Sequence, residues 1–292
     1  MISKKVWSRL LLLVFLSVSI LLIVIYFNHE TYQAPPAGAL GDYLLFNGSE
    51  VLSVHIGEDG FQIRPREGPG VWPTSWGTPT LCITTSQLFT TVGDSVGLVT
   101  TENGEYHFQK LANGINPSIS PDGQKLAFYD KSGSITIFDL ETKKSKAMNI
   151  VASLGSILVW ISQTDLLFSD TELVLSVLNI DTGLLTGTGI TNVLPFSITP
   201  DGSKVLCSTM FPSNVLIYDP QENDMIVAIE NTSFGLVWSL DSRGFLFCRY
   251  RRLSNPFKDA PDLYYFSLSN ETSYHLAKYF RLHNGIHLKG TK

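Results

Sequence analysis

One segment of the sequence occurs twice in closely similar form. Residues 119–144 read ISPDGQKLAFYDKSGSITIFDLETKK, and residues 198–223 read ITPDGSKVLCSTMFPSNVLIYDPQEN. Both copies contain Pro-Asp-Gly, then an apolar alternation, then an aromatic residue followed by aspartate. Alternation with a period of two is typical of β-strands, and Asp-Gly is typical of the tight turn between them. Each copy therefore predicts an antiparallel sheet, and the duplication predicts a repeat architecture.

Weaker copies extend the repeat over the remaining chain with a period of about 40 residues. The second strand of each unit begins near residue 42, 87, 125, 165, 204 or 244. Six four-stranded sheets with two apolar faces each cannot bury both faces alone, so they must stack around an axis. The sequence therefore predicts an all-β fold, a six-bladed β-propeller over residues 42–292. The first unit lacks its first strand, and residues 284–292 are expected to return and supply it, which would hide the last sheet edge.

Large apolar residues recur where the first strand of a unit is expected. Ile119, Ile198 and Trp238 each precede an apolar residue of the second strand by nine positions. Trp160 precedes Phe168 by eight positions, so the fourth unit is expected to be one residue shorter. We expect these residues to pack in the core between neighbouring sheets.

The N-terminus has a different composition. Residues 10–27 contain no charge over 18 positions, and a basic tail at residues 1–9 precedes them. A helix of this length measures about 27 Å, close to the roughly 30 Å of the hydrocarbon core of a bilayer. The basic residues on the N-terminal side predict that the tail is cytoplasmic and that the propeller is exported. We therefore expect one N-terminal transmembrane helix, a signal anchor in the lipid bilayer, followed by a Pro/Gly/Ala linker at residues 28–41.

The alternative to an anchor is a cleaved signal peptide, for which Ala37-Gly38-Ala39 supplies an A-x-A site. That site lies well beyond the apolar run, and the run exceeds the roughly 7 to 15 residues of a signal-peptide core. In both cases the propeller is expected outside the cytoplasm, in the periplasm or at the cell exterior.

The pattern Ser/Thr-Pro-Asp-Gly-x-Lys-apolar, preceded by an apolar residue or tryptophan, resembles the WD-like repeats of TolB-type six-bladed propellers of bacterial envelopes. The resemblance covers residues 42–292 and is strongest in the third and fifth units. It implies a periplasmic, protein-binding role. The sequence departs from TolB in having an expected anchor where TolB has a separate N-terminal domain.

Composition excludes some functional classes. The net charge of −5 argues against a nucleic-acid binder, which normally has a basic face. Cys82, Cys207 and Cys248 are odd in number and have no Cys-x-x-Cys spacing, so they support neither a disulfide framework nor a zinc site. We expect each of them to be a buried apolar residue.

Two motifs are better explained by structure than by chemistry. Residues 93–97, GDSVG, match the G-x-S-x-G nucleophile elbow, but the elbow needs a helix after the serine and a strand-like sequence follows Ser95. His283 and His287 would lie about 13 Å apart along a strand, too far for one metal ion. No catalytic residue, metal site or cofactor is therefore expected.

Two insertions interrupt the repeat, at residues 64–79 between the first and second units and at residues 249–261 within the sixth. Both are expected on one face of the ring, in neighbouring blades. Loops on a rigid scaffold often bind partners, and Trp, Tyr and Arg often anchor interfaces. The predicted binding residues are Arg64, Arg66, Trp72, Trp76, Arg249, Tyr250, Arg251, Arg252, Phe257 and Lys258. The alternative is a solvated charge run and a tryptophan loop that fills the seam between blades.

These features favour a membrane-anchored, extracytoplasmic propeller that binds or scaffolds a protein segment or an envelope polymer. One alternative is a propeller enzyme of the lyase, lactonase or glycosidase type with its site at the channel mouth. Another is the ectodomain of a sensor. Enzymes of those types need convergent carboxylates or a metal set, and no such set recurs at the starts of the first strands.

Overall fold

The structure is a computed structural model that describes residues 32–46, 51–64, 80–81, 87–102, 105–153, 156–209, 213–230, 233–249, 261–278 and 284–288. The expected tail at residues 1–9 and the expected transmembrane helix at residues 10–27 lie outside these ranges. Within the described ranges, no helix is both long enough and apolar enough to span a bilayer.

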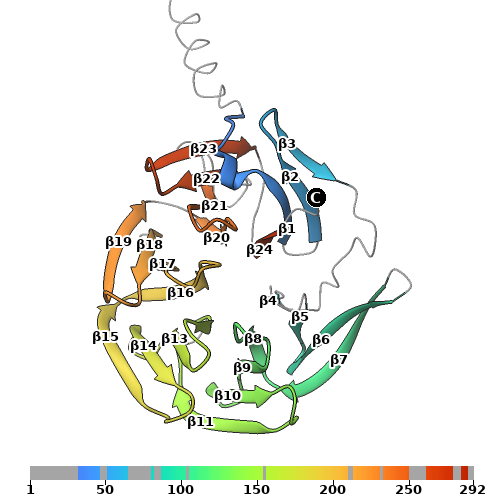
Figure 1. The fold of residues 1–292 in the computed structure, drawn as a ribbon. Helices are drawn as coiled ribbons and strands as arrows, with labels where there is room; N and C mark the ends of the chain where they lie inside the picture. Colours follow the sequence, from blue (N-terminus) through green and yellow to red (C-terminus); the bar gives the residue numbers. More distant parts are fainter. Residues whose placement is uncertain are drawn as a thin grey trace, which may run out of the picture.

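The described residues form six four-stranded antiparallel sheets arranged in a ring (Figure 1), as the repeat predicted. In each sheet, or blade, strand a lies nearest the axis and strand d lies at the rim. Blade one comprises β24 (Asn284–Leu288), β1 (Gly41–Phe46), β2 (Val51–Ile56) and β3 (Phe61–Arg64). Blade two comprises β4 (Thr80–Leu81), β5 (Leu88–Val92), β6 (Ser95–Glu102) and β7 (Glu105–Asn113). Blade three comprises β8 (Ile115–Ile119), β9 (Lys125–Tyr129), β10 (Ser134–Asp139) and β11 (Ser145–Val151).

The other three blades follow the same order from strand a to strand d. Blade four comprises β12 (Val159–Trp160), β13 (Asp165–Ser169), β14 (Val174–Asn179) and β15 (Leu185–Thr191). Blade five comprises β16 (Val193–Ile198), β17 (Val205–Thr209), β18 (Val215–Asp219) and β19 (Asp224–Ile229). Blade six comprises β20 (Ser233–Trp238), β21 (Gly244–Arg249), β22 (Asp262–Ser267) and β23 (Thr272–Ala277).

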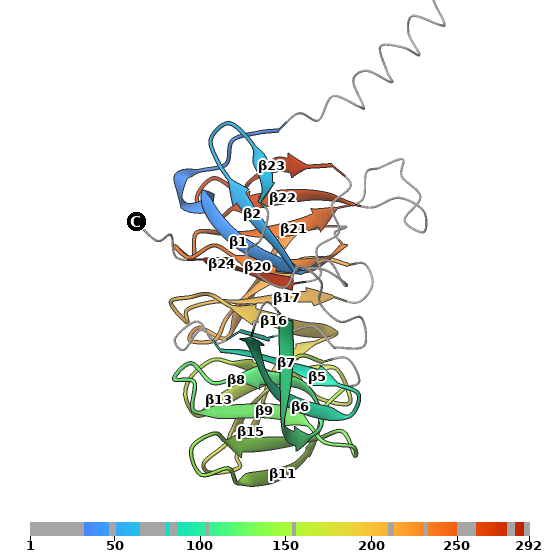
Figure 2. The ribbon, with the colours of Figure 1, turned by 90° about the vertical axis from the view of Figure 1, so that its right-hand side faces the viewer.

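The C-terminal strand closes the ring. β24 pairs antiparallel with β1, with Asp42 opposite Leu288 and Phe46 opposite Asn284, so the last strand of the chain supplies strand a of blade one. Figure 2 shows the ring from the side, with β24 beside β1 and next to β20 of blade six. The closure expected from residues 284–292 is therefore confirmed for residues 284–288.

The turns between strands a and b have the predicted Asp-Gly geometry. Gly123 and Gly202 have positive φ values of 73° and 75°, and Ser242 takes the same conformation at 59°. In blade four the turn is one residue shorter, because Trp160 pairs with Leu166 whereas Trp238 pairs with Phe245. The shorter fourth unit is therefore also confirmed.

The core lies in the seams between blades rather than at the axis. Five buried apolar clusters occupy the seams between blades two and three, three and four, four and five, five and six, and six and one. Trp160 and Trp238 belong to two of these clusters, as predicted. Each indole N–H also donates to a backbone carbonyl of strand a in the preceding blade, from Trp160 to Ser118 at 3.0 Å and from Trp238 to Ser197 at 3.2 Å.

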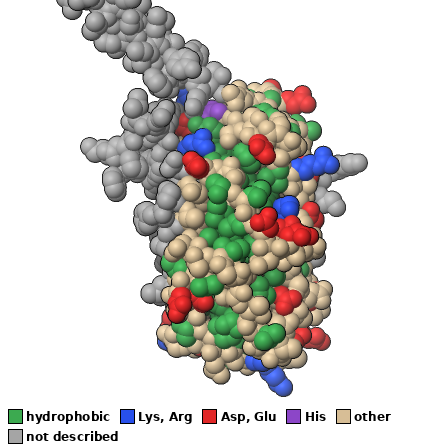
Figure 3. Space-filling model, turned by 90° about the vertical axis from the view of Figure 1, so that its left-hand side faces the viewer, with side chains coloured by type: hydrophobic (Ala, Val, Ile, Leu, Met, Phe, Trp, Pro, Cys, Tyr) green, Lys and Arg blue, Asp and Glu red, His purple; other side chains and the backbone are tan. Residues whose placement is uncertain are grey.

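The rim consists of d strands whose outer edges are unpaired within the described residues. Those of blades two to six each carry a register shift, and Asn149 in β11 and Gly189 in β15 have positive φ at such positions. Bulges of this kind twist an edge away from further pairing. Figure 3 views the rim on the side of β15 and β19, where patches of hydrophobic side chains lie among polar surface. Leu184, just before β15, and Val227 in β19 are exposed apolar residues.

The described part of the expected linker packs against the propeller. Residues 32–40, here called the strut, include a 3-10 turn, η1 (Ala37–Ala39), and lie against blades one and six. Pro35 and Ala39 are buried, and β1 begins directly after Leu40. Outside η1, the described residues contain no helix.

Candidate functional site

The structure describes the side chain of one predicted binding residue, Arg249. Arg64 is described by its backbone, as the last residue of β3, where it pairs with Ser53 of β2. The remaining predicted residues lie outside the described ranges: Arg66, Trp72, Trp76, Tyr250, Arg251, Arg252, Phe257 and Lys258. The meeting of the two insertions therefore stays a prediction.

The turn from strand b to strand c lies beside the connection from strand d to strand a of the next blade, in the blades where the structure describes both segments. Gly114 N, after β7, donates to Asp94 O in the turn between β5 and β6 at 2.8 Å. Asn192 N, after β15, donates to Leu173 O in the turn between β13 and β14 at 2.9 Å. These connections therefore leave one face of the ring, here called the insertion face. β21 ends at a b-to-c connection of this kind, and β3 ends at a d-to-a connection.

Arg249 is the last residue of β21, and aromatic rings hold its guanidinium group. Its central carbon lies 5.5 Å from the ring centroid of Phe247 and 5.9 Å from that of Tyr264. The two rings stack on each other with centroids 5.4 Å apart. The Nε atom of Arg249 is buried and has no hydrogen-bond partner among the described residues. Two rings thus hold the planar cation, and its Nε donor lacks a partner among the described residues.

A buried acid and histidine lie beside this arginine. Asp262 stands opposite Arg249 in the pairing of β21 with β22, and it is fully buried. Its Oδ2 atom lies 3.2 Å from Nε2 of the buried His275 on β23. His275 also meets the edge of Tyr264, with ring centroids 5.1 Å apart. Alternation places these side chains with Phe247 on the side of blade six that faces blade five.

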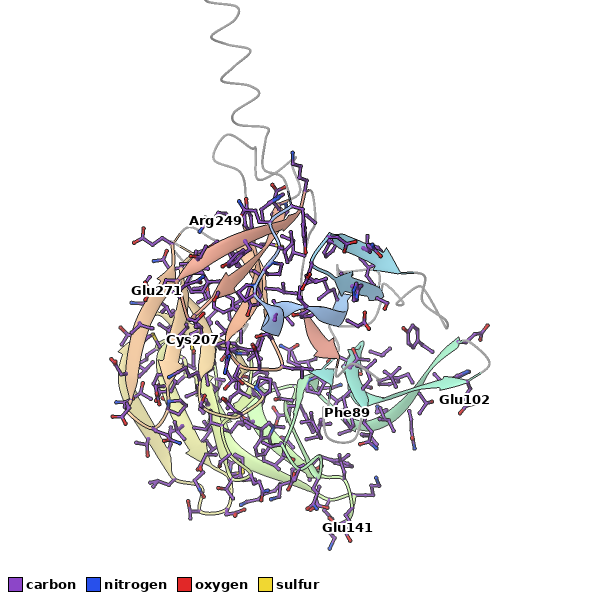
Figure 4. The ribbon with its side chains drawn as sticks, turned by 45° about the horizontal axis from the view of Figure 1, so that its top comes forward. Phe89, Glu102, Glu141, Cys207, Arg249 and Glu271 are labelled. Carbon is purple, nitrogen blue, oxygen red and sulfur yellow. The ribbon has the colours of Figure 1, made fainter. Side chains whose placement is uncertain are left out.

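This polar cluster consists of Arg249, Phe247, Asp262, Tyr264 and His275. Sequence reasoning identified Arg249 and missed the other four. Alternation in the runs DLYYFS and TSYHLA indicated which residues share a face. It could not indicate which residue of β22 stands opposite Arg249, because an insertion separates the two strands. Figure 4 shows Arg249 on blade six, away from Glu141 on blade three.

Ion pairing elsewhere on the insertion face is at the surface. Lys131 Nζ lies 2.6 Å from Asp94 Oδ2, which joins turns of blades two and three. The hydrogen bond from Lys131 holds the pKa of Asp94 below its ordinary value. Exposed pairs of this kind contribute little to stability, so this pair orients two turns and is not a candidate site.

Ser95 lies in a hairpin, as predicted. Gly93 and Asp94 form the two-residue turn between β5 and β6, and Ser95 begins β6 instead of a helix. Its hydroxyl is buried and donates to Asp94 Oδ1 at 3.3 Å. The G-x-S-x-G match is therefore a turn sequence.

Cys207 and Cys248 are buried in strands, as expected, and Cys82 lies outside the described ranges. Burial raises the pKa of the Cys207 thiol well above its ordinary value. In the part of the chain that the structure describes, no three His, Cys, Asp or Glu side chains are grouped so that they could hold a metal ion.

Comparison with known proteins finds likeness in structure only. No protein-family model and no curated protein matches the sequence. TolB from Acinetobacter baumannii superposes with a TM-score of 0.61 at 13% identity, over 84% of this chain and 65% of that one. A protein described as TolB from Agrobacterium tumefaciens gives 0.57 at 13% identity, over 84% and 91%. An oligogalacturonate lyase in complex with manganese gives 0.52 at 14% identity, over 86% and 78%.

The chain spans slightly less than two thirds of the Acinetobacter protein, and at these identities the likeness concerns the fold. Blade number, strand order and the resemblance of the repeats agree with it. The chain folds as a TolB-like six-bladed β-propeller.

Proposed function

We propose that this protein is a membrane-anchored, extracytoplasmic propeller that binds a protein segment on its insertion face. The observation that carries the proposal is Arg249, which is stacked on Phe247 and Tyr264 and has a buried donor without a partner among the described residues. A half-buried guanidinium that is held on aromatic rings is suited to a carboxylate or a carbonyl oxygen. Trp, Tyr and Arg are also the residues that most often dominate binding energy at interfaces.

Two further points support a protein partner. The TolB resemblance implies a protein-binding role in the bacterial envelope. The neighbouring insertion carries further basic and aromatic residues at Tyr250, Arg251 and Arg252. An envelope polymer with carboxylate groups could bind the same arginine. A competition experiment distinguishes a polymer from a protein segment.

The proposed anchor rests on residues 10–27, an uncharged apolar run after a basic tail. On this proposal the protein lies in the cell membrane as a single-pass protein. Its N-terminus is cytoplasmic, and its propeller faces the periplasm or the cell exterior.

The test uses the immobilised propeller and an extract of envelope proteins. Arg249→Ala should reduce capture of the bound protein, and Arg249→Lys should reduce it as well, because an ammonium group does not reproduce the stacked planar fork. Arg243→Ala is the matched control, since Arg243 is an exposed arginine of the same blade in the turn between β20 and β21. The unfolding temperature of each variant should stay close to that of the parent.

Equal capture by the parent and both Arg249 variants would contradict the proposal. Loss of capture in the presence of oligogalacturonate, but not of a neutral oligosaccharide, would favour an acidic polymer over a protein segment.

A second candidate is a propeller enzyme, which the likeness to oligogalacturonate lyase favours. Incubation of the purified protein with oligogalacturonate, with and without added manganese, tests it. Formation of unsaturated products would support the lyase, and their absence in both conditions would leave binding as the better account.

A further inference from the structure

The strut begins with contacts to two blades at once. The hydroxyl of Tyr32 donates to the carbonyl of Gly57, in the turn between β2 and β3 of blade one. Gln33 N donates to the carbonyl of His275 on β23 at 2.8 Å, and His275 N donates to Gln33 Oε1 at 3.4 Å. The first two described residues therefore bridge the outer strand of blade six and a turn of blade one.

The other end of the strut is buried in the seam between the same blades. Ala39 is fully buried in the core cluster that blades one and six share. The Tyr43 hydroxyl donates to the carbonyl of Ala39 at 2.8 Å. Burial holds the pKa of Tyr43 well above its ordinary value, so the hydroxyl keeps its proton and remains a donor. A Cβ atom at Gly38 would lie 1.6 Å from Asp241 Oδ2, so a larger residue would have to displace either the Asp241 carboxyl group or the strut.

This docking leaves little chain between the propeller and the expected transmembrane helix. A free linker at residues 28–41 would let the propeller rotate and move away from the membrane. With the strut fixed, residues 28–31 alone separate Phe27 from Tyr32. Five Cα steps span at most about 18 Å even when fully extended. A domain of this size is roughly 40 Å across, so the tether is shorter than the propeller itself.

We propose that the strut holds the rim of blades one and six against the lipid surface, so that the ring stands on edge at the membrane. This inference rests on the anchor of the proposed function. The partner surface is the headgroup layer of the anchor's own bilayer. Glu58 and Asp59 make the turn beside Tyr32 acidic and exposed, so this rim is not attracted to anionic lipids. The short tether alone keeps the rim near the membrane. Both faces of the ring, including the insertion face, stay open to partners.

The experiment compares two exposed glutamates in equivalent turns between strands c and d. Glu58 lies in blade one beside the strut, and Glu141 lies in blade three, on the far side of the ring (Figure 4). Each is changed to cysteine in a Cys82→Ser background, labelled with a fluorophore, and placed in phosphatidylcholine vesicles in the full-length chain. Quenchers on the lipid headgroups should reduce the fluorescence at position 58 and leave that at position 141 unchanged.

The control inserts a flexible Gly/Ser segment of about 20 residues between Asn28 and Tyr32, which lengthens the tether and leaves the strut intact. The difference between positions 58 and 141 should then disappear. Equal quenching of the two labels in the parent, or a difference that survives the insertion, would overturn the inference while the anchor stands. A chain that does not float with the vesicles would overturn the anchor and, with it, the inference.

Discussion

At the scale of single residues, the carboxylates of the turns do most of the local organisation. Ser120 donates to Asp122 at 2.6 Å and Ser239 donates to Asp241 at 2.6 Å, each within the turn from strand a to strand b. Asp201 takes the equivalent position in blade five, where its Oδ1 accepts from the backbone N and the hydroxyl of Ser203 at 3.0 and 2.7 Å. Burial alone would raise the pKa of Asp201, but hydrogen bonds from Thr199 and Ser203 outweigh it and lower the pKa to about 2.

These hydrogen bonds predict how stability depends on acidity. A carboxyl whose pKa is lower in the folded state stabilises the fold above its unfolded pKa of about 3.9 and loses that contribution as the pH falls through the folded value. The free energy of unfolding should therefore decrease between about pH 4 and about pH 2. Asp201→Asn keeps an acceptor but not the charge, so its unfolding free energy should fall less steeply in this window.

Urea unfolding at several pH values measures both slopes. Asp201→Ala removes the acceptor as well, and it should lower stability at neutral pH, which separates the turn hydrogen bonds from the charge. A slope for Asp201→Asn equal to that of the parent would show that Asp201 does not contribute to the acid response.

At this scale the sequence predicted what depends on near neighbours. The Asp-Gly turns follow from residues a few positions apart, so their positive φ values were predictable. The surroundings of Arg249 were not, because strand register places Asp262 opposite Arg249 and His275 opposite Tyr264. Eight of the ten predicted binding residues lie outside the described ranges, so their roles remain predictions.

At the scale of elements, tryptophan side chains link the a strands of blades three and four and those of blades five and six by hydrogen bonds. The indole of Trp238 packs edge-on against Phe245 at 5.5 Å and donates to Ser197 O at 3.2 Å. Trp238→Phe removes the donor and part of the ring, and it leaves a carbonyl in the seam between blades five and six without this partner. We expect a loss of about 1 to 3 kcal/mol in the free energy of unfolding, measured by urea denaturation.

Tyr218→Phe is the control, since it removes a hydrogen bond from Tyr218 to Asn223 within blade five, where the partner is exposed. We expect it to cost less, about 0.5 to 1.5 kcal/mol. Equal losses of unfolding free energy in the two variants would mean that the indole hydrogen bond between blades stabilises the fold no more than a hydrogen bond within one blade.

The elements show where sequence patterns stop being informative. Alternation predicted the strands, and the spacing of Trp160 predicted the shorter turn of blade four. The register shifts of the d strands were not predicted, because these strands are largely exposed and their apolar pattern is too weak to reveal an extra residue. The strut was expected to be a linker because Pro, Ala and Gly are common in linkers, whereas its docking depends on tertiary contacts of Tyr32, Gln33 and Ala39.

At the scale of the whole molecule, the ring brings the two ends of the propeller together in blade one. Strand a of that blade comes from residues 284–288 and strand b from residues 41–46. Blade one therefore combines strands from both ends of the propeller, and its strands β1 and β2 share a buried cluster with blade six. The strut is fixed to the same two blades, so closure also determines where the proposed anchor joins the propeller.

Disulfide trapping of the closing pair tests this most directly. Leu44 stands opposite Ile286 in the pairing of β1 with β24, and opposed residues of antiparallel strands have Cα atoms about 4.5 to 5.5 Å apart, within the range of a disulfide. In a Cys82→Ser background, Leu44→Cys with Ile286→Cys should crosslink on mild oxidation of the folded protein and raise its unfolding temperature. Leu44→Cys with His287→Cys, which is one residue out of register, should not crosslink. Failure of the first pair to crosslink, or equal crosslinking by both pairs, would contradict closure of the ring by β24.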